Sequence, residues 1–551
     1  MNLNFTFINF SVLIFLILFY FLEIRSKKIF KYRTIIYLIL FIPLILYTFG
    51  DNLSAKWWII DDHEIFYYLT PNTETQSTYG LWFIDTLIHK TEIGQFGDYP
   101  RYRLSYFPLR ILEAYLFQDS AFYYYSLRLI FILYFFFTLF LLVTRYLTFA
   151  IGIGILLLVF SETYWSDIFS RLGPGEWYCL VGTSIIFHVF SNSKSFIKYS
   201  FLENIFLSFG IILAAGSKEN FFILIFLSLY LIYINFRNRK IILTIISIIP
   251  VILIVFSIVP LGIYFLKQPS DMYGNSTKLL DRIMNFIPFV KSLFFMNSLW
   301  IGIASLSSIC ILIFKSNVPR YLTLNKKNIY LIFSLLILFL FNVVFYNSIW
   351  PTNSRYDFPG LFVYQMMIVI TLSLCLTVLI NLLDINRKLK LIVRNAFLIC
   401  IICFFVNFKS IDSLKEYSQI NSKRTNEYTN FVNHFIQDFK LKNQELVFFI
   451  NRGWDLEPLI AFHRFLSYYG IHQKNFILVS NKNEFNKHHR ELMEAMRSFS
   501  INGSDDYYVK PINFNILKNS DCIVLVFSPS HIEDFEDINV CKSTKVELIP
   551  F

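Results

Sequence analysis

The sequence is poor in charge: Asp, Glu, Lys and Arg make up 16% of its 551 residues, whereas soluble globular proteins carry about 25%. Hydrophobic residues supply 56% and aromatic residues 19%, and they gather in repeated runs of roughly 20 residues. A soluble globular protein is therefore excluded, and the sequence predicts a polytopic α-helical membrane protein. The net charge of +11 does not indicate nucleic acid, because the basic residues lie in short loops between apolar segments.

The sequence also lacks several motifs that would indicate a particular kind of binding site. There is no Gly-rich phosphate loop, so nucleotide binding is not indicated. The seven cysteines show no metal-ligand spacing, and most of them fall in or beside apolar segments as small apolar residues. Cys522 and Cys541 lie in the C-terminal region, where a disulfide between them is permitted outside the cytoplasm. No internal repeat is visible, which argues against the inverted-repeat plan of many transporters.

Apolar segments long enough to cross a membrane recur along the first 408 residues. We expect twelve spans, near 4–23, 34–49, 122–145, 147–162, 177–191, 200–215, 220–236, 241–266, 292–314, 328–346, 360–384 and 392–408. The first segment has no basic residues before it, no small-residue cleavage site and a basic flank after it. It is therefore expected to be a retained span rather than a signal peptide.

The basic residues predict which loops face the cytoplasm. The loop 25–33 carries Arg25, Lys27, Lys28, Lys31 and Arg33 and no acidic residue. Alternate loops agree, with Lys194 and Lys198; Arg237, Arg239 and Lys240; Lys315, Arg320, Lys326 and Lys327; and Arg387, Lys388, Lys390 and Arg394. By contrast, the loop 50–121 holds ten Asp and Glu against five Lys and Arg. The positive-inside rule therefore predicts that both termini and this loop lie outside the cytoplasm.

After about residue 408 the composition becomes polar, with short apolar stretches. We expect helices near 425–442, 455–469 and 484–499, and strands near 446–450, 476–480, 522–527 and 545–549. Alternating strands and helices predict a small α/β domain with a mainly parallel sheet. The expected division is a transmembrane domain over 1–408, which includes the external loop 50–121, and an extracytoplasmic soluble domain over 409–551.

The first external loop contains residues suited to a reaction with a phosphate leaving group. At about 70 residues it is too long for a simple connector. Its acidic run is Asp61, Asp62, His63 and Glu64, and its later arginines are Arg101, Arg103 and Arg110. A carboxylate can deprotonate a hydroxyl nucleophile, and arginines can grip a phosphate with two hydrogen bonds. The alternative is a solvated, salt-bridged loop without chemistry.

Three further polar clusters fall on the same predicted side of the membrane. They are Ser217-Lys218-Glu219-Asn220, the stretch Trp350–Pro359 with Arg355 and Tyr356, and a loop with Glu162, Asp167, Arg171, Gly173-Pro174-Gly175 and Glu176. Taken singly, each has an ordinary explanation as a snorkelling pair, an interfacial anchor or a solvated loop. Their shared side of the membrane favours one distributed polar site.

These motifs resemble those of the GT-C superfamily of integral-membrane glycosyltransferases, which use polyprenyl-phosphate-linked sugars. The resemblance is to bacterial members related to the protein O-mannosyltransferases and the lipid A aminoarabinose transferases. It covers roughly residues 34–408 and rests on Asp61–Glu64, Arg101-Tyr102-Arg103, Pro108–Glu113, Ser217–Asn220 and Ser354–Pro359. The chain departs from the family in having an additional span before the acidic loop, and Leu104 where many relatives have Pro.

The resemblance implies an inverting glycosyltransferase in the bacterial inner membrane, with its site on the periplasmic side. The donor would be a polyprenyl-phosphate-linked sugar, and the acceptor a glycan, a lipid or a protein. The implied catalytic residues are Asp62, Asp61 and Glu64, with Asp62 or Asp61 as general base. Implied ligands of the donor phosphate are Arg101, Arg103, Lys218 and Arg355, and implied substrate contacts are Glu219, Tyr356 and His63. No cofactor is required, no metal ligand is assigned although a divalent cation is compatible, and nucleic acid is not an expected partner.

Three other functions remain open from the sequence. An O-antigen polymerase or ligase would rely on arginines and a histidine of later loops and leave the acidic run without a role. A transporter or flippase of lipid-linked sugars would need polar residues at mid-bilayer, where this chain has mostly Phe, Ile and Leu. A structural subunit would leave the clustered Arg, Lys and carboxylates unexplained.

Overall fold

In a computed structural model of the protein, the chain forms two compact units, which are described separately. Unit 1 comprises Met1–Gly50, Arg128–Ser170 and Gly175–Tyr417, and unit 2 comprises Asp51–Leu127, Arg171–Pro174 and Ser418–Phe551. The residues that the structure describes are 7–25, 32–70, 82–93, 102–193, 199–267, 284, 334–342, 354–381, 385–441, 444–450, 456–471, 475–479, 507–511, 521–527 and 541–550.

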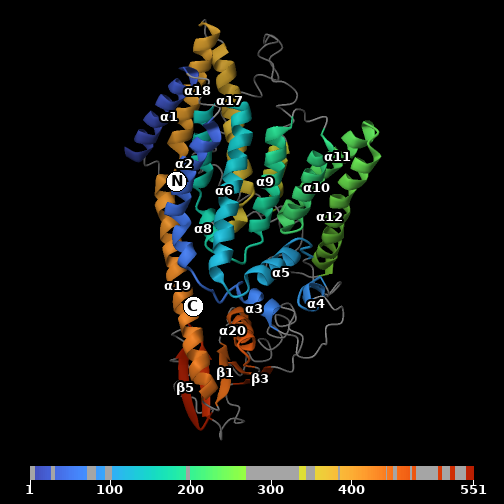
Figure 1. The fold of residues 1–551 in the computed structure, drawn as a ribbon, viewed down its shortest axis with the longest axis vertical. Helices are drawn as coiled ribbons and strands as arrows, with labels where there is room; N and C mark the ends of the chain where they lie inside the picture. Colours follow the sequence, from blue (N-terminus) through green and yellow to red (C-terminus); the bar gives the residue numbers. More distant parts are fainter. Residues whose placement is uncertain are drawn as a thin grey trace. The chain divides into compact units, whose positions relative to one another are not determined.

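Unit 1 is built from apolar helices. They are α1 (Phe7–Arg25), α2 (Arg33–Phe49), most of α6 (Ala121–Tyr146), α7 (Phe149–Phe160), α8 (Tyr164–Phe169), α9 (Glu176–Asn192), α10 (Phe201–Ala215), α11 (Ile225–Arg237), α12 (Ile241–Lys267), α17 (Gly360–Asn381) and α18 (Arg387–Phe405). Two short 3-10 segments, η3 (Glu219–Leu224) and η4 (Arg355–Asp357), interrupt this pattern. Helices α9, α10, α11 and α12 lie side by side (Figure 1). Many apolar side chains of α1, α2 and α12 are exposed, as expected for helices that face lipid.

Several of these helices are candidate membrane spans. In the described part of the chain, six helices are long and apolar enough to cross a membrane, or up to seven if the bent pair of α18 and α19 (Phe408–Leu441) forms one span. The six are Ile8–Arg25, Arg33–Ser54, Ala121–Tyr146, Glu219–Arg237, Ile241–Ile263 and Gly360–Thr377. These helices agree with a multi-pass helical membrane protein. The count of twelve stays a prediction, because α7 and α10 are shorter and the expected spans 292–314 and most of 328–346 lie outside the described residues.

Unit 2 combines the first long loop with the C-terminal region. The loop contributes most of η2 (Gly50–Ser54), α3 (His63–Leu69), α4 (Trp82–His89) and α5 (Tyr106–Phe117). The C-terminal region contributes α20 (Leu456–Tyr468) and the strands β1 (Glu445–Ile450), β2 (Asn475–Val479), β3 (Tyr507–Pro511), β4 (Asp521–Val526) and β5 (Ser543–Leu548). Side chains of both segments share one hydrophobic core. Phe66 of α3, for example, lies 4.3 Å from Phe465 of α20 between ring centroids. The contacts therefore group the loop with the C-terminal region, whereas the sequence-based division had placed the loop with the membrane domain.

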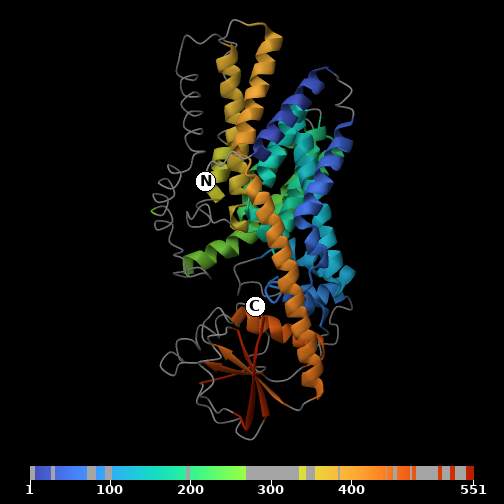
Figure 2. The ribbon, with the colours of Figure 1, turned by 90° about the vertical axis from the view of Figure 1, so that its left-hand side faces the viewer.

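The strands of unit 2 form one sheet (Figure 2). All neighbouring strands are parallel, and their order is β3-β2-β1-β4-β5. Phe448 of β1 pairs with Ile477 of β2 on one side and with Leu525 of β4 on the other. Because parallel strands are covered on both faces, their sequences are continuous apolar runs, as Leu446–Ile450 and Cys522–Phe527 show. The expected α/β architecture is confirmed, and β3 is an addition that its short, proline-ended sequence did not predict. The expected helix 484–499 lies outside the described residues.

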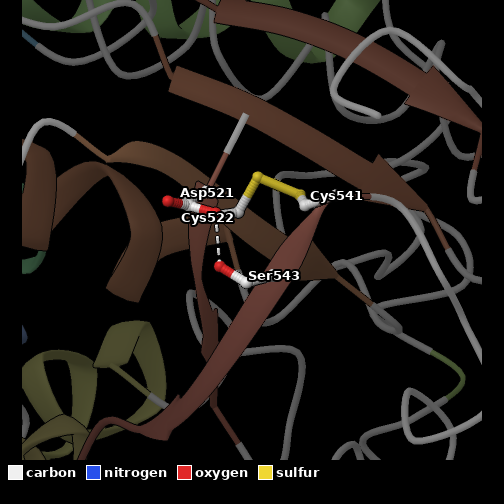
Figure 3. The surroundings of a disulfide bond; sticks show 4 residues. All are labelled: Asp521, Cys522, Cys541 and Ser543. Carbon is white, nitrogen blue, oxygen red and sulfur yellow. Dashed lines mark hydrogen bonds between the residues drawn. A yellow bond between two sulfur atoms is a disulfide. The ribbon is translucent and has the colours of Figure 1, made fainter. Parts of the chain in front are cut away.

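A disulfide joins Cys522 of β4 to Cys541, just before β5 (Figure 3). Nearby, the Ser543 hydroxyl donates a hydrogen bond to the Asp521 carboxylate. The bond has a sequence separation of 19, and a loop of that size removes enough unfolded-chain entropy to stabilise the fold by roughly 3 kcal/mol. The pairing that the sequence permitted is therefore present.

We expect Cys541→Ser to lower the free energy of unfolding of unit 2 by roughly 3 kcal/mol, because the unfolded chain regains its loop entropy. Denaturant unfolding of the full-length protein, followed by far-UV circular dichroism, measures the change. The matched control is Cys400→Ser, since Cys400 is a free cysteine and its replacement leaves the disulfide in place. An unchanged midpoint for Cys541→Ser would contradict a stabilising role for the bond.

Candidate functional site

The acidic run forms the start of helix α3. Asp61 has a φ of 68°, in the left-handed region, and Asp62 then occupies the N-cap position before the helix begins at His63. Glu64 stands in the first turn, where a carboxylate interacts favourably with the positive end of the helix dipole. The run is therefore a turn followed by a helix start, and its side chains point in different directions.

Asp62 is the buried carboxylate of the run. Its side chain is 2% exposed, and its Oδ2 accepts a hydrogen bond of 2.8 Å from the backbone N–H of Trp58. Burial raises the pKa of Asp62 to about 7, and this rise is opposed by the positive charge of Arg110. A carboxyl group that titrates near neutral pH is suited to accept a proton as a general base.

Asp61 is held by an ion pair rather than by burial. Its Oδ2 lies 2.8 Å from Nη2 of Arg171, and about a quarter of each side chain is exposed. Gly173 packs directly on Asp61: a Cβ at position 173 would lie 2.0 Å from the Asp61 Cβ. The loop with Arg171 and Gly173-Pro174-Gly175 has an ordinary sequence interpretation as a solvated loop, but it supplies the cation and the close approach that fix Asp61.

Glu64 lies in a buried network with α5. Its Oε2 is 2.8 Å from the Tyr106 hydroxyl, which is also 3.1 Å from the carbonyl oxygen of Gly173. Arg110 is fully buried, lies 4.0 Å from Glu64 and 3.8 Å from Glu113, and donates a 2.9 Å hydrogen bond to the Leu172 carbonyl. Burial raises the pKa of Glu64, and Arg110 opposes that rise. Arg110 is thus the central cation of this network.

His63 contacts the C-terminal region. Its Nδ1 lies 2.9 Å from Nη1 of Arg464 on α20, and both side chains are buried. Because a guanidinium group can only donate, Nδ1 is the acceptor and the imidazole carries its proton on Nε2. Burial, with Arg464 adding to it, lowers the pKa of His63 well below its usual value. The imidazole is therefore neutral, and Arg464 also covers the ring of Tyr67 at 4.1 Å.

The arginines expected to bind the donor phosphate in this loop are only partly described. Arg103 is half-buried, and its guanidinium lies 5.5 Å from the centre of the Tyr106 ring. It therefore shares a neighbour with Glu64. Arg101 lies outside the described residues.

A second cluster lies in unit 1 and joins two of the polar motifs. Lys218 forms a buried ion pair with Glu176 at 2.9 Å. The Lys218 ammonium lies 5.1 Å from the centre of the Tyr356 ring, and the Arg355 guanidinium lies 5.4 Å from the same ring. The motif around Lys218 and the motif around Arg355 are therefore brought together at Tyr356.

Hydrogen bonds strengthen this second cluster. The Asn220 amide donates to the Asn342 side chain at 3.0 Å and to the carbonyl oxygen of Phe358 at 3.1 Å. The backbone N–H of Arg355 donates to Asp167 at 3.2 Å. Neighbouring Glu219 is buried as well. Three of the four sequence clusters thus contribute to one polar region of unit 1.

Two carboxylates of this region, the half-buried Glu162 and the buried Asp357, repel each other electrostatically. The Gln365 amide donates a hydrogen bond to Glu162. Burial raises the pKa of Glu162 to about 8, and the negative charge of Asp357 adds to the rise. Within the described residues, no group of three or more His, Cys, Asp or Glu side chains is arranged to hold a metal ion.

Sequence reasoning missed two charged side chains. Arg464 gave no signal, because its partner His63 is distant in sequence. Arg128 did give one, since it is an arginine within the apolar helix α6, where charge is costly and often functional. It is buried, with its guanidinium 5.2 Å from the Trp177 ring and 5.4 Å from the Tyr178 ring.

Comparisons of this chain with protein-family models, with curated proteins and with solved structures found no match. The molecule's own candidates for function are therefore two clusters of polar side chains. One surrounds Asp62 in unit 2, and the other surrounds Tyr356 in unit 1.

Proposed function

We propose that this protein is an inverting glycosyltransferase that moves a sugar from a polyprenyl-phosphate donor to a hydroxyl-bearing acceptor. The observation that carries the proposal is the Asp62 carboxyl, whose pKa of about 7 suits a general base. It belongs to the same network as Arg110 and Arg171, whose charges favour its ionised form. The motif resemblance to GT-C enzymes supplies the class of donor.

In the proposed reaction, Asp62 accepts the proton of the acceptor hydroxyl as that oxygen attacks the anomeric carbon. The bond between the anomeric carbon and the phosphate oxygen breaks, and its electron pair stays on the phosphate. Attack opposite the leaving group inverts the anomeric configuration. Asp62 then releases its proton to solvent, which its near-neutral pKa allows. Cations that meet the departing phosphate lower the barrier, since charge develops there.

Phosphate binding is proposed for Arg101, Arg103, Lys218 and Arg355. For Lys218 and Arg355 the proposal is supported by their cationic groups, which both lie over the ring of Tyr356. Lys218 and Arg355 add a point charge and a planar donor group, and phosphate accepts from both types. Substrate contacts are proposed for Glu219, Tyr356 and His63. The proposed location is the bacterial inner membrane, with the site on the periplasmic side and a glycan, lipid or protein as acceptor.

The test is sugar transfer by purified full-length protein in lipid nanodiscs. A synthetic polyprenyl-phosphate donor with a radiolabelled sugar is incubated with membrane extract as the source of acceptor. We expect a new covalent sugar adduct, with one polyprenyl phosphate released for each sugar transferred. In proteoliposomes, movement of the intact donor across the bilayer without any adduct would instead support a transporter and contradict the proposal.

A further inference from the structure

Helix α5 carries charge on its buried face and apolar side chains on its outer face. Arg110 and Glu113 are buried, whereas Leu112, Tyr115 and Leu116 are exposed. In a helix at the surface of a water-soluble protein, the apolar stripe faces the core and the charges face water. This helix places its charges inside instead. Its outer face is therefore suited to an apolar medium rather than to water.

The exposed apolar surface extends beyond α5. Trp82 of α4 lies 5.5 Å from Tyr115 between ring centroids, and Phe117 at the end of α5 lies 5.9 Å from Tyr123 of α6. We define the apolar patch by its exposed members, which are Trp82 (37%), Leu112 (43%), Tyr115 (61%), Leu116 (60%), Phe122 (51%) and Tyr123 (54%). Half of them are Trp or Tyr, the residues enriched at membrane–water interfaces.

The chain itself keeps the patch close to a membrane. Helix α5 ends at Phe117, and the candidate span α6 begins at Ala121. Four residues reach at most about 14 Å, and Phe122 and Tyr123 already belong to the first turn of the span. The zone between hydrocarbon and water is roughly 5–7 Å thick on each side of a bilayer. The end of α5 is therefore restricted to the neighbourhood of that zone.

We propose that the apolar patch is a membrane-contact surface, with Tyr115 and Leu116 in the lipid interface. The partner is the bilayer, since the patch continues into the first turn of a membrane span. This inference is independent of the proposed transfer reaction. It has one consequence for the acidic run: an α-helix is about 10–12 Å across, so the Arg110–Glu64 network on the inner face of α5 lies within about that distance of lipid.

The experiment places a polarity-sensitive fluorescent amino acid at position 115 of the full-length protein in nanodiscs. Fluorescence is compared between ordinary lipid and a mixture of lipids brominated near the headgroup end and near the middle of their acyl chains. The positive control is position 252, because Ile252 is exposed on α12 inside a candidate span. The negative control is position 423, because Lys423 is 80% exposed on α19.

We expect blue-shifted emission at position 115 and a loss of intensity in brominated lipid comparable with that at position 252. Position 116 should behave in the same way, which guards against a local effect of one substitution. Emission and quenching like those at position 423 would overturn the proposal. Blue-shifted emission without quenching would also overturn it, because another protein surface, such as a second copy, would then cover the patch.

Discussion

Asp62→Asn lowers sugar transfer by about 10²–10⁴-fold, the usual effect of removing a general base, if Asp62 accepts the hydroxyl proton. The amide is nearly the same size as the carboxylate, and its oxygen still accepts the hydrogen bond from the Trp58 N–H. Structure is therefore preserved while basicity is lost. The measurement is the initial rate in the nanodisc assay. The matched control is Asp51→Asn, because Asp51 lies in the same loop, in η2, and is not among the charges that shift the pKa of Asp62.

The pH dependence of transfer provides a second readout for Asp62. Since the pKa is raised to about 7, the ionised base fraction grows through neutral pH, and wild-type rates should rise and level off above pH 7. The rate of Asp62→Asn should not show this rise with pH. Wild-type rates in Asp62→Asn, together with an active Asp61→Asn, would remove both residues as candidate general bases and contradict the proposal.

We expect Asp62→Asn to lose activity without losing thermal stability at high pH. A carboxyl group whose pKa is higher in the folded state than in the unfolded chain stabilises the fold at low pH, and that contribution is lost as pH rises through the folded pKa. For Asp62 the window runs from its ordinary value of 3.8 to about 7. At pH 8 we therefore expect Asp62→Asn to unfold at a temperature no lower than the wild type.

Arg110→Met has the largest expected effect on stability, a loss of about 3–5 kcal/mol, because it leaves the buried Glu113 and the partly buried Glu64 without their cation. Arg110 is fully buried and lies within 4.0 Å of both Glu64 and Glu113. Methionine retains the apolar stem, so the lost charge is the main change. Thermal unfolding at pH 8 measures the effect.

The matched control for this prediction is Lys423→Met, which breaks an exposed pair to Glu427 at 3.9 Å and should cost no more than about 0.5 kcal/mol. The loss in Arg110→Met should shrink as pH falls, because the pKa of Glu64 is raised further without Arg110 and a protonated carboxyl group needs no cation. Adding Glu64→Gln to Arg110→Met should recover part of the stability. Equal melting temperatures for Arg110→Met and Lys423→Met at pH 8 would contradict a central role for Arg110.

The local chemistry of the site was accessible from the sequence because it is carried by short motifs. Apolar runs located the spans 34–49 and 122–145 that flank the first loop, and shorter apolar runs located four of the five strands in the described part of the sheet. The meeting of Lys218 with Tyr356 agrees with the expectation that these motifs share one side of the membrane. Each of these results depends on residues near each other in sequence or on hydropathy alone.

The remaining features depend on packing between distant segments. His63 and Arg464 are 401 positions apart, and the sequence around either residue does not predict that the two are in contact. The near-neutral pKa of Asp62 arises from burial, which a charged sequence such as Asp61–Glu64 does not suggest. Composition likewise could not show that Phe66 is covered by Phe465, so the first loop was grouped with the spans that flank it.

The order of segments in unit 2 sets the order of its assembly. Its first part ends at Leu127 and its last part begins at Ser418, so the ribosome makes the 290 residues 128–417 between them. At 5–20 residues per second, this takes roughly 15–60 s. During that time Trp57, Ile65 and Phe66 await the C-terminal side chains that complete their core. A nascent chain stalled before residue 418 would therefore present this loop with its hydrophobic residues uncovered, as a substrate for chaperones and proteases.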